Sequence, residues 1–342
     1  MSVLIKIILY PFSLLYAIGV WIRAFFFLIG IYKRKSFDIP IISVGNLTVG
    51  GTGKTPHVEY LIDFFKNRSV ATLSRGYGRK SKGYLLANES STANDIGDEP
   101  LQLFKKNSDN ISVAVCEKRV EGIKRLLKDK KNTQLVILDD AFQHRFVKPK
   151  LSILLADYHR PFYKDVLLPA GRLREPRSFS RYADIVVVSK CPPNISSEKM
   201  KSIRKKIAYY TSSPVFFSKM IYKKPYSYNN KPVALNSIDK CVSLSGIARP
   251  ELFIDYVNNH HTVIKSFKFA DHHRFKVLEL VEIIDYCMEN NAAIFTTEKD
   301  MMRLMNFDLE NLLQKVLLIV VPIKVEVIEG EKLFHDQLNA IL

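Results

Sequence analysis

The chain has 342 residues, of which 47% are hydrophobic and 25% charged, so it can bury large cores and is expected to form two domains. This composition excludes a disordered or fibrous protein. Lys and Arg number 51 against 34 Asp and Glu, and the net charge of +17 points to a partner that carries phosphate, as a lipid headgroup, a nucleotide or a nucleic acid. The cysteines lie far apart, which fits neither a zinc site nor a disulfide framework and indicates a reducing, cytosolic compartment: Cys116, Cys191, Cys241 and Cys287.

Residues 1–37 form an apolar segment without acidic side chains. The uncharged run over residues 7–22 is shorter than the roughly 20 residues that cross a bilayer, and Pro11 and Arg23 interrupt any longer run. The segment is therefore expected to be a monotopic membrane anchor, with the basic residues 33–35 on the cytoplasmic, anionic surface. The alternative is an apolar helix that is buried against its own domain.

A short strand over residues 39–44 leads into a glycine-rich loop, GNLTVGGTGKT, at residues 45–55, and a helix is predicted after it. In such a loop backbone N–H groups converge on phosphate oxygens, Lys54 reaches the β- and γ-phosphates, and Thr55 offers its hydroxyl to Mg²⁺. The loop therefore predicts ATP and Mg²⁺ as cofactors, although Thr48 replaces the usual first glycine. The residues expected to bind the nucleotide are Thr48, Val49, Gly50, Gly51, Thr52, Gly53, Lys54 and Thr55.

A second buried strand is predicted over residues 134–138, and it ends in Asp139 and Asp140. Carboxylates at the end of a strand beside a phosphate loop bind or orient Mg²⁺, so both are assigned to the metal. The alternative for Asp140 is that it only caps the following turn.

Further apolar runs at residues 70–73, 111–115, 151–156 and 185–188 alternate with helical patterns, which predicts an α/β fold with a mostly parallel sheet and helices on both faces. The loops that follow its strands are expected to surround one crevice. These loops start at Gly45, Ser74, Glu117, Asp139, Asp157 and Lys190. They supply four candidate substrate or phosphate contacts, Arg75, Tyr77, Arg119 and His144, and the alternative for the first two is a solvated basic turn.

The polar residues 87–97 are expected to form a flexible loop, after which Asp98 is a candidate general base and Glu99 a candidate metal ligand. Residues 271–273, Asp-His-His, could bind a metal, orient a base or cap the next helix, and zinc is the least favoured of these. Residues 296–300, TTEKD, resemble a helix start with a capping threonine and acidic first turn.

Several motifs together resemble the tetraacyldisaccharide 4'-kinases of lipid A biosynthesis, and the resemblance extends along most of the chain. They are GNLTVGGTGKTP at 45–56, SRGYG at 74–78, GDEP at 97–100, DDAFQH at 139–144, LPAGRLREP at 168–176, FADHH at 269–273 and TTEKD at 296–300. Ala141, where the family often has Gly, and Arg172, where many members have Pro, are the departures from its pattern.

The resemblance implies a P-loop kinase that transfers the γ-phosphoryl group of ATP to the 4'-hydroxyl of a tetraacylated glucosamine disaccharide 1-phosphate, at the cytoplasmic face of the inner membrane, with lipid IVA as product. It implies that Asp98 and His272 together activate the sugar hydroxyl, and that Arg174 and Glu175 belong to the substrate-binding residues. The partners are then the lipid disaccharide and an anionic membrane surface, with no nucleic acid and no obligate protein partner.

A second, smaller α/β lobe is expected after a strand pair that joins the two lobes. The expected divisions are residues 1–37 for the membrane segment, 38–212 for the kinase domain, 213–236 for the linker and 237–342 for the C-terminal domain. Asp98 and His272 would then lie on opposite lobes, so closure of the lobes is expected to assemble the site.

Two other classes of protein compete with the kinase. A positioning ATPase that cycles on and off membranes has a lysine just before its glycine pair, and this chain has Val49 there. A nucleic-acid-binding NTPase would suit the charge of +17, but the basic residues are scattered and no RNA- or DNA-binding motif is recognised.

Overall fold

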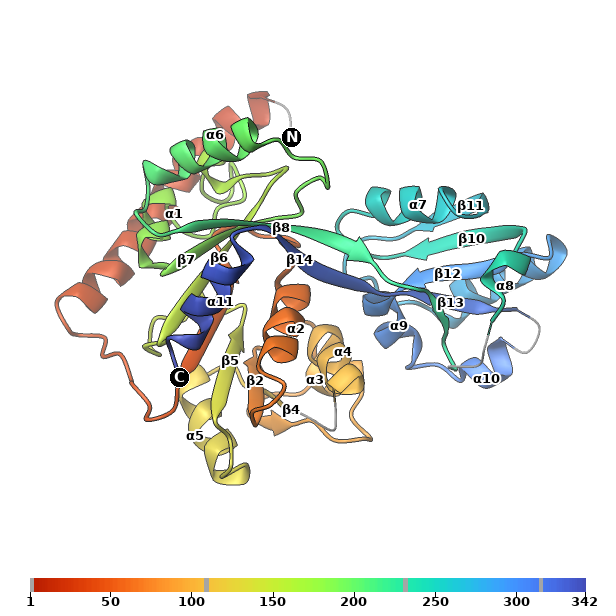
Figure 1. Ribbon diagram of the computed structural model, residues 1–342, viewed down its shortest axis with the longest axis horizontal. Coiled ribbons are helices and arrows are strands. Elements are labelled where there is room, and N and C mark those ends of the chain that lie inside the picture. The colour runs from red at the N-terminus through yellow and green to blue at the C-terminus, as the bar shows by residue number, and fades with distance from the viewer. Residues whose placement is uncertain (1–2, 108–110, 230–232, 314–315) are drawn as a thin grey trace. The chain divides into compact units, whose positions relative to one another are not determined.

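The computed structural model describes residues 3–107, 111–229, 233–313 and 316–342. The chain forms two compact units, each assembled from separate segments (Figure 1). Unit 1 comprises Met1–Arg75, Asp109–Met220 and Val325–Leu342, and unit 2 comprises Gly76–Ser108 and Ile221–Lys324. Two segments are therefore grouped differently from the sequence-based divisions, since residues 76–108 belong to unit 2 and residues 325–342 to unit 1.

Unit 1 is built on a mostly parallel sheet with the strand order β14-β8-β7-β6-β1-β5-β2-β4. Its strands are β1 (Ile41–Asn46), β2 (Val70–Ser74), β4 (Ile111–Val115), β5 (Leu135–Asp139), β6 (Leu151–Asp157), β7 (Ile185–Ser189), β8 (Val215–Tyr222) and β14 (Ile323–Glu329). Its helices are α1 (Val3–Leu28), α2 (Lys54–Phe64), α5 (Arg119–Asp129), α6 (Ser197–Ala208) and α11 (Glu331–Asn339), with 3₁₀ turns η1 (Phe162–Lys164) and η2 (Arg177–Tyr182). The central strands β1, β5 and β7 are buried along their whole length, as expected where both faces of a sheet are covered.

Two neighbouring residues of β8 establish that helices cover both faces of this sheet. The ring of Phe216 contacts Phe334 of α11, with centroids 5.1 Å apart. Phe217 belongs to the core cluster that contains Met200 and Ile207 of α6. Because successive strand residues point to opposite faces, α11 and α6 lie on opposite sides of the sheet, and the expected fold class is confirmed.

The N-terminal segment is one continuous helix, α1, which passes through Pro11 without a break. By length and composition alone it could cross a membrane, whereas the sequence favoured a monotopic anchor because Pro11 and Arg23 interrupt the apolar run. The helix is not buried against the domain, since only 6% of its most apolar window is buried. One stripe nevertheless contacts unit 1: the Ser13 hydroxyl donates to Leu167 O (3.0 Å) and the Tyr16 hydroxyl to Arg174 O (2.8 Å).

Unit 2 has a second sheet with the order β11-β10-β12-β13-β9, parallel except for β9. The strands of this sheet are β9 (Tyr226–Ser227), β10 (Lys240–Ser245), β11 (Thr262–Lys268), β12 (Ala293–Thr297) and β13 (Leu318–Val321). The short strand β3 (Leu85–Leu86) also lies in unit 2 but is not part of this sheet. Its helices are α3 (Ala93–Ile96), α4 (Asp98–Asn107), α7 (Glu251–Asn258), α8 (Val277–Glu289), α9 (Glu298–Leu304) and α10 (Leu309–Leu312), with the 3₁₀ turn η3 (Leu235–Ser237). The second α/β lobe is therefore confirmed.

The strands that join the units come from distant parts of the sequence. β8 has its first residues in unit 1 and its last in unit 2, and β14, its neighbour in the sheet, runs from unit 2 into unit 1. A strand pair does link the lobes, but its second strand, β14, begins 87 residues after the end of the linker segment 213–236 that the sequence suggested.

Candidate active-site residues

The glycine-rich loop of unit 1 is held by contacts on several sides. Asn46 Nδ2 donates to Thr52 Oγ1 (2.9 Å), and the Ser189 hydroxyl donates to Thr52 O (2.8 Å). Gly53 lies at φ +84° at the start of α2, in the left-handed region that glycine tolerates best. The loop therefore presents the N-terminus of α2 and its backbone N–H groups, which is the arrangement that binds phosphate.

Lys54 and Asp140 form the polar centre of this site. Lys54 Nζ lies 3.7 Å from Asp140 Oδ1, and the Arg174 guanidinium donates to both oxygens of Asp140 (2.8 and 3.2 Å). Burial alone would raise the pKa of Asp140, but the charges of Lys54 and Arg174 outweigh it and lower the pKa to about 2. Asp140 is thus ionised at neutral pH and faces two cations.

The side chains at this site fit Mg²⁺. The Thr55 hydroxyl at the start of α2 and the carboxylates of Asp139 and Asp140 at the end of β5 are oxygen donors, which Mg²⁺ prefers. In the described part of the chain no group of three or more His, Cys, Asp or Glu side chains converges on one metal position. Mg²⁺ commonly takes one or two carboxylates, and water and phosphate oxygens complete its shell, so a small protein ligand set is sufficient.

Three further residues of unit 1 were predicted to contact substrate or phosphate, and their side chains carry nitrogen groups: Arg75, Arg119 and His144. Arg119 is buried and donates to Cys116 O (2.6 Å), and burial lowers its pKa to about 10, which leaves it charged. Burial, with the charges of Arg119 and Arg23, lowers the pKa of His144 to about 4, so its imidazole is neutral at pH 7. The charge of Arg75 acts on both Arg119 and His144. The cluster therefore offers hydrogen-bond donors and positive charge to a phosphate.

Glu175 pairs with a residue that the sequence did not single out. Its Oε1 lies 3.3 Å from Arg145 NH2, and the Arg145 guanidinium lies over the rings of Phe179 (4.3 Å) and Tyr182 (4.2 Å). Glu175 and Arg145 are both buried. These contacts indicate that Glu175 holds its loop in place.

In unit 2, two glycine motifs pack against each other. Gly97 has φ +94°, and a Cβ atom there would lie 2.9 Å from Tyr77 O. Gly76 has φ +69°, and its Cβ would lie 2.8 Å from Ile96 O. The glycines of SRGYG and GDEP are therefore required for the close approach of these loops, which ends with Asp98 buried at the start of α4.

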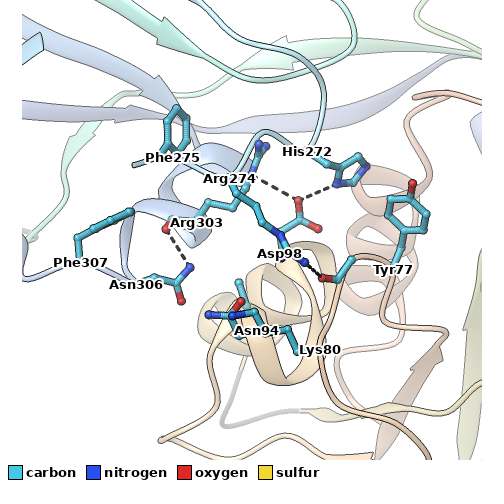
Figure 2. Close-up of a pocket in the computed structure, with 12 residues that line it drawn as sticks. Tyr77, Lys80, Asn94, Asp98, His272, Arg274, Phe275, Arg303, Asn306 and Phe307 are labelled. Atoms are coloured by element: carbon cyan, nitrogen blue, oxygen red, sulfur yellow. Dashed lines mark hydrogen bonds and ion pairs between the residues drawn. The ribbon is translucent and has the colours of Figure 1, made fainter. Parts of the chain in front are cut away.

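Asp98 and His272 share a hydrogen bond within unit 2, with Asp98 Oδ2 3.0 Å from His272 Nδ1 (Figure 2). The expectation that they lie on opposite lobes is wrong, and no lobe closure is needed to bring them together. Burial would raise the pKa of Asp98, but the hydrogen bond from His272 and the charge of Lys299 outweigh burial and lower the pKa. The Tyr77 ring lies 5.0 Å from the His272 ring.

These residues line a cavity of about 310 Å³, into which Asp98, His272 and Arg303 project (Figure 2). Arg303 Nε lies 3.5 Å from Asp98 Oδ2, and its NH2 lies 2.9 Å from Asp300 Oδ1. The sequence reading missed Arg303. Arg303 lies four residues after Lys299 on the same helix, so the two side chains lie on one face of α9. This spacing could have indicated that Arg303 lies near the TTEKD motif.

The remaining motif residues have local partners. His273 Nε2 lies 2.9 Å from Glu279 Oε2 at the start of α8, so His273 does not share the position of His272. In TTEKD, Thr297 Oγ1 accepts from Asp300 N (3.1 Å) and caps α9, as expected. Glu99, predicted as a metal ligand, lies 3.1 Å from Lys299 Nζ.

The predicted residues thus fall into two groups. Unit 1 brings together the loop residues from Thr48 to Thr55 with Asp139, Asp140, Arg75, Arg119, His144, Arg174 and Glu175. Unit 2 brings together Tyr77, Asp98, Glu99 and His272.

Comparison with known proteins gives one consistent result. A family model described as Tetraacyldisaccharide-1-P 4'-kinase matches residues 5–342. The chain is 43% identical to the tetraacyldisaccharide 4'-kinase of Phocaeicola vulgatus, over 97% of this chain and 93% of that protein, and 44% identical to that of Flavobacterium johnsoniae, over 88% of each. It is also similar to the crystal structure of LpxK from Aquifex aeolicus in complex with ATP, with a TM-score of 0.78 and 30% identity over 98% of this chain and 99% of that chain.

Proposed function

Because the chain belongs to the tetraacyldisaccharide-1-P 4'-kinase family, we propose that it transfers the γ-phosphoryl group of ATP to the 4'-hydroxyl of a tetraacyldisaccharide 1-phosphate. The observation that carries this conclusion is the match of one family model to residues 5–342, which include all the motifs described above. The product is the lipid A precursor lipid IVA.

In unit 1 the chain binds and neutralises the triphosphate. The backbone N–H groups of residues 50–55 donate to phosphate oxygens, whereas that of Val49 already donates to Arg172 O (2.8 Å). Lys54 supplies charge at the transferred group. Thr55, Asp139 and Asp140 would hold Mg²⁺, which when bound neutralises negative charge on the phosphates. Arg174 already contacts Asp140, so it can keep this carboxylate aligned while Lys54 turns to the nucleotide.

In unit 2, Asp98 accepts the proton of the sugar hydroxyl. A bond forms from the hydroxyl oxygen to the γ-phosphorus, the bond from that phosphorus to the β,γ-bridging oxygen breaks, and ADP leaves. A sugar hydroxyl loses its proton late in such a transfer, so an ionised carboxylate suffices. The lowered pKa of Asp98 supports this role, since it keeps the carboxylate ionised at neutral pH.

We further infer that α1 binds the surface of the inner membrane at its cytoplasmic face. The exposed apolar side chains of α1 include Leu4, Ile7, Ile8, Phe12, Leu15, Ile18, Ile22 and Phe25. The opposite stripe contacts unit 1 at Ser13, Tyr16 and Arg23, so these residues cannot also be surrounded by lipid. This division of the helix favours a monotopic anchor that delivers the lipid substrate and contacts anionic headgroups.

The proposed activity is tested with Lys54→Met, incubated with ATP labelled at the γ-phosphate, Mg²⁺ and the disaccharide 1-phosphate in detergent. We expect incorporation of label into lipid to fall by roughly 100-fold or more, since a charge at the transferred group is removed. Lys66→Met, an exposed lysine just after the same helix, is the matched control and should retain wild-type incorporation. Full incorporation by the Lys54 variant would exclude the proposed role of the loop.

A further inference from the structure

Lys299, in the TTEKD motif, contacts three acceptors in unit 2. Its Nζ lies 3.1 Å from Glu99 Oε1, 3.4 Å from Asp271 Oδ1 and 3.2 Å from His272 Nε2. The residue is at the start of α9, where the capping Thr297 and the buried Asp300 fix the first turn. An ammonium group has three N–H donors and no acceptor, so three acceptors match its hydrogen-bonding capacity.

This contact defines the protonation of the His272 ring. Because Lys299 can only donate, Nε2 must present its lone pair, and the single proton of a neutral imidazole then lies on Nδ1. Nδ1 lies 3.0 Å from Asp98 Oδ2, so it donates to the carboxylate. Burial alone would lower the pKa of Lys299, but Glu99, Asp98 and Asp271 outweigh it and raise the pKa, which supports a charged ammonium.

The surroundings hold both partners of this contact. His272 has φ +59°, an uncommon conformation for a residue with a side chain, and Tyr77 lies against its ring. Arg303 Nε lies 3.5 Å from Asp98 Oδ2, the same oxygen that accepts the hydrogen bond from His272 Nδ1. The charged groups that contact His272 are Asp98 from α4, Lys299 from α9 and Asp271 from its own loop. Glu99 and Arg303 contact Lys299 and Asp98 in turn.

We propose that Lys299 is a positioning residue for phosphoryl transfer: it fixes His272 as the neutral form protonated on Nδ1, so that His272 donates to Asp98 and orients it toward the sugar hydroxyl. The inference rests on the proposed function. Without the ammonium, the ring can place its proton on Nε2, and Nδ1 then presents a lone pair to the carboxylate. The hydrogen bond that orients Asp98 is lost in that form.

The first test is direct and needs no substitution of Lys299. Full-length protein labelled with ¹⁵N in its histidines is studied by NMR in detergent at pH 7, and His272→Gln identifies the signals of His272. We expect Nδ1 protonated and Nε2 unprotonated in the wild type. A proton on Nε2, alone or together with one on Nδ1, would overturn the inference whatever the activity of the enzyme.

The second test compares kinetics of Lys299→Met, Lys299→Arg and Lys106→Met. Lys106 is the matched control, because its Nζ forms an ion pair (2.8 Å) with Glu298, the residue that precedes Lys299 on α9. We expect Lys299→Met to lower kcat by roughly 10- to 100-fold, the range found for partners that orient a reacting group, with the KM for ATP unchanged. Lys299→Arg, which keeps a cationic donor, should recover part of this loss.

The outcomes separate the two hypotheses. If the wild type forms no labelled lipid, the proposed function fails, and the NMR result still decides the form of His272. If the wild type is active and Lys299→Met loses no more kcat than Lys106→Met, the positioning role is wrong. If Lys299→Met does not fold, Lys299→Arg and the NMR measurement on the wild type remain decisive.

Discussion

His57 illustrates how a single buried side chain ties the phosphate loop to the sheet. Its Nδ1 lies 2.7 Å from Gly53 O and its Nε2 lies 2.9 Å from the Ser218 hydroxyl in β8. Burial lowers the pKa of His57 to about 4, although the hydrogen bond to Gly53 opposes the shift. The imidazole is therefore neutral in the folded protein at pH 7.

This environment predicts a pH-dependent stability. Between pH 6.5 and pH 4 the unfolded chain takes up a proton at His57 that the folded chain does not, so the free energy of unfolding should fall as the pH falls through this range. The contribution is on the order of 3 kcal/mol. Denaturant unfolding at several pH values, compared with His57→Gln, isolates it, because other groups titrate in both proteins. Equal pH dependence of the two would contradict the prediction.

Single residues also mark the limits of the sequence reading. Lys54, Asp140 and Asp98 could be predicted as site residues because each stands in a local motif. Lys299 and Arg303 were not, because a helix-capping pattern explains TTEKD fully and gives no sign of which distant side chains the rest of the turn contacts. Arg145 was missed for the same reason, since its partners Glu175 and Tyr182 are 30 or more residues away.

At the level of elements, the approach of two loops in unit 2 depends on glycine. Gly97→Ala should destabilise the protein by about 2–4 kcal/mol, because a Cβ at φ +94° is strained and also meets Tyr77 O. Gly83→Ala is the matched control: it has φ +77° and open space around its Cβ, so strain alone should cost about 1–2 kcal/mol. Thermal or denaturant unfolding measures both. If both variants lost the same free energy of unfolding, the close contact between Gly97 and Tyr77 O would not contribute to stability.

α1 allows a second prediction at this scale. Leu15 is 66% exposed, and Leu15→Lys should weaken binding to anionic phospholipid vesicles by roughly 10-fold or more, since about 1.5–3 kcal/mol of apolar burial is removed. Tyr209→Ser, at an aromatic residue just after α6 that is 76% exposed, should leave vesicle binding unchanged. Sedimentation with vesicles measures both. Undiminished binding of the Leu15 variant would show that α1 is not the anchor.

At the level of the whole molecule, unit 2 consists of two separate segments of the chain, so it cannot be produced as a single continuous fragment. Its helix α9 carries Glu298 and Arg303, both buried, and their charge partners Lys106 and Asp98 belong to the segment 76–108. Buried charges without partners are strongly destabilising.

The isolated segment 221–324 should therefore lack a cooperative unfolding transition. A chain in which residues 76–108 are joined to 221–324 through a flexible linker should regain one, because it restores the buried ion pairs. Circular dichroism during thermal unfolding distinguishes the two. Cooperative unfolding of residues 221–324 alone would show that α4 is dispensable for the unit.

The sequence predicted the parallel strands of unit 1 well, because each is a short apolar run between helical patterns, and it predicted the second α/β lobe in outline. It failed where chain order and spatial order diverge. Residues 76–108 lie between strands of unit 1 but belong to unit 2, and β14 returns from the far end of the chain to pair with β8. Local patterning cannot report such pairings, since they are decided by contacts between segments more than a hundred residues apart.

The hydroxyl of Tyr16 donates to the carbonyl of Arg174, the residue whose guanidinium holds Asp140. Helix α1, which we propose to bind the membrane, is thus hydrogen-bonded to the residue that contacts Asp140, and it is held against the rest of unit 1 instead of moving freely. With α1 at the bilayer surface, this attachment would fix the distance between the phosphate loop and the lipid plane. Changes in bilayer thickness or headgroup packing should then alter turnover even when every chemical group is intact.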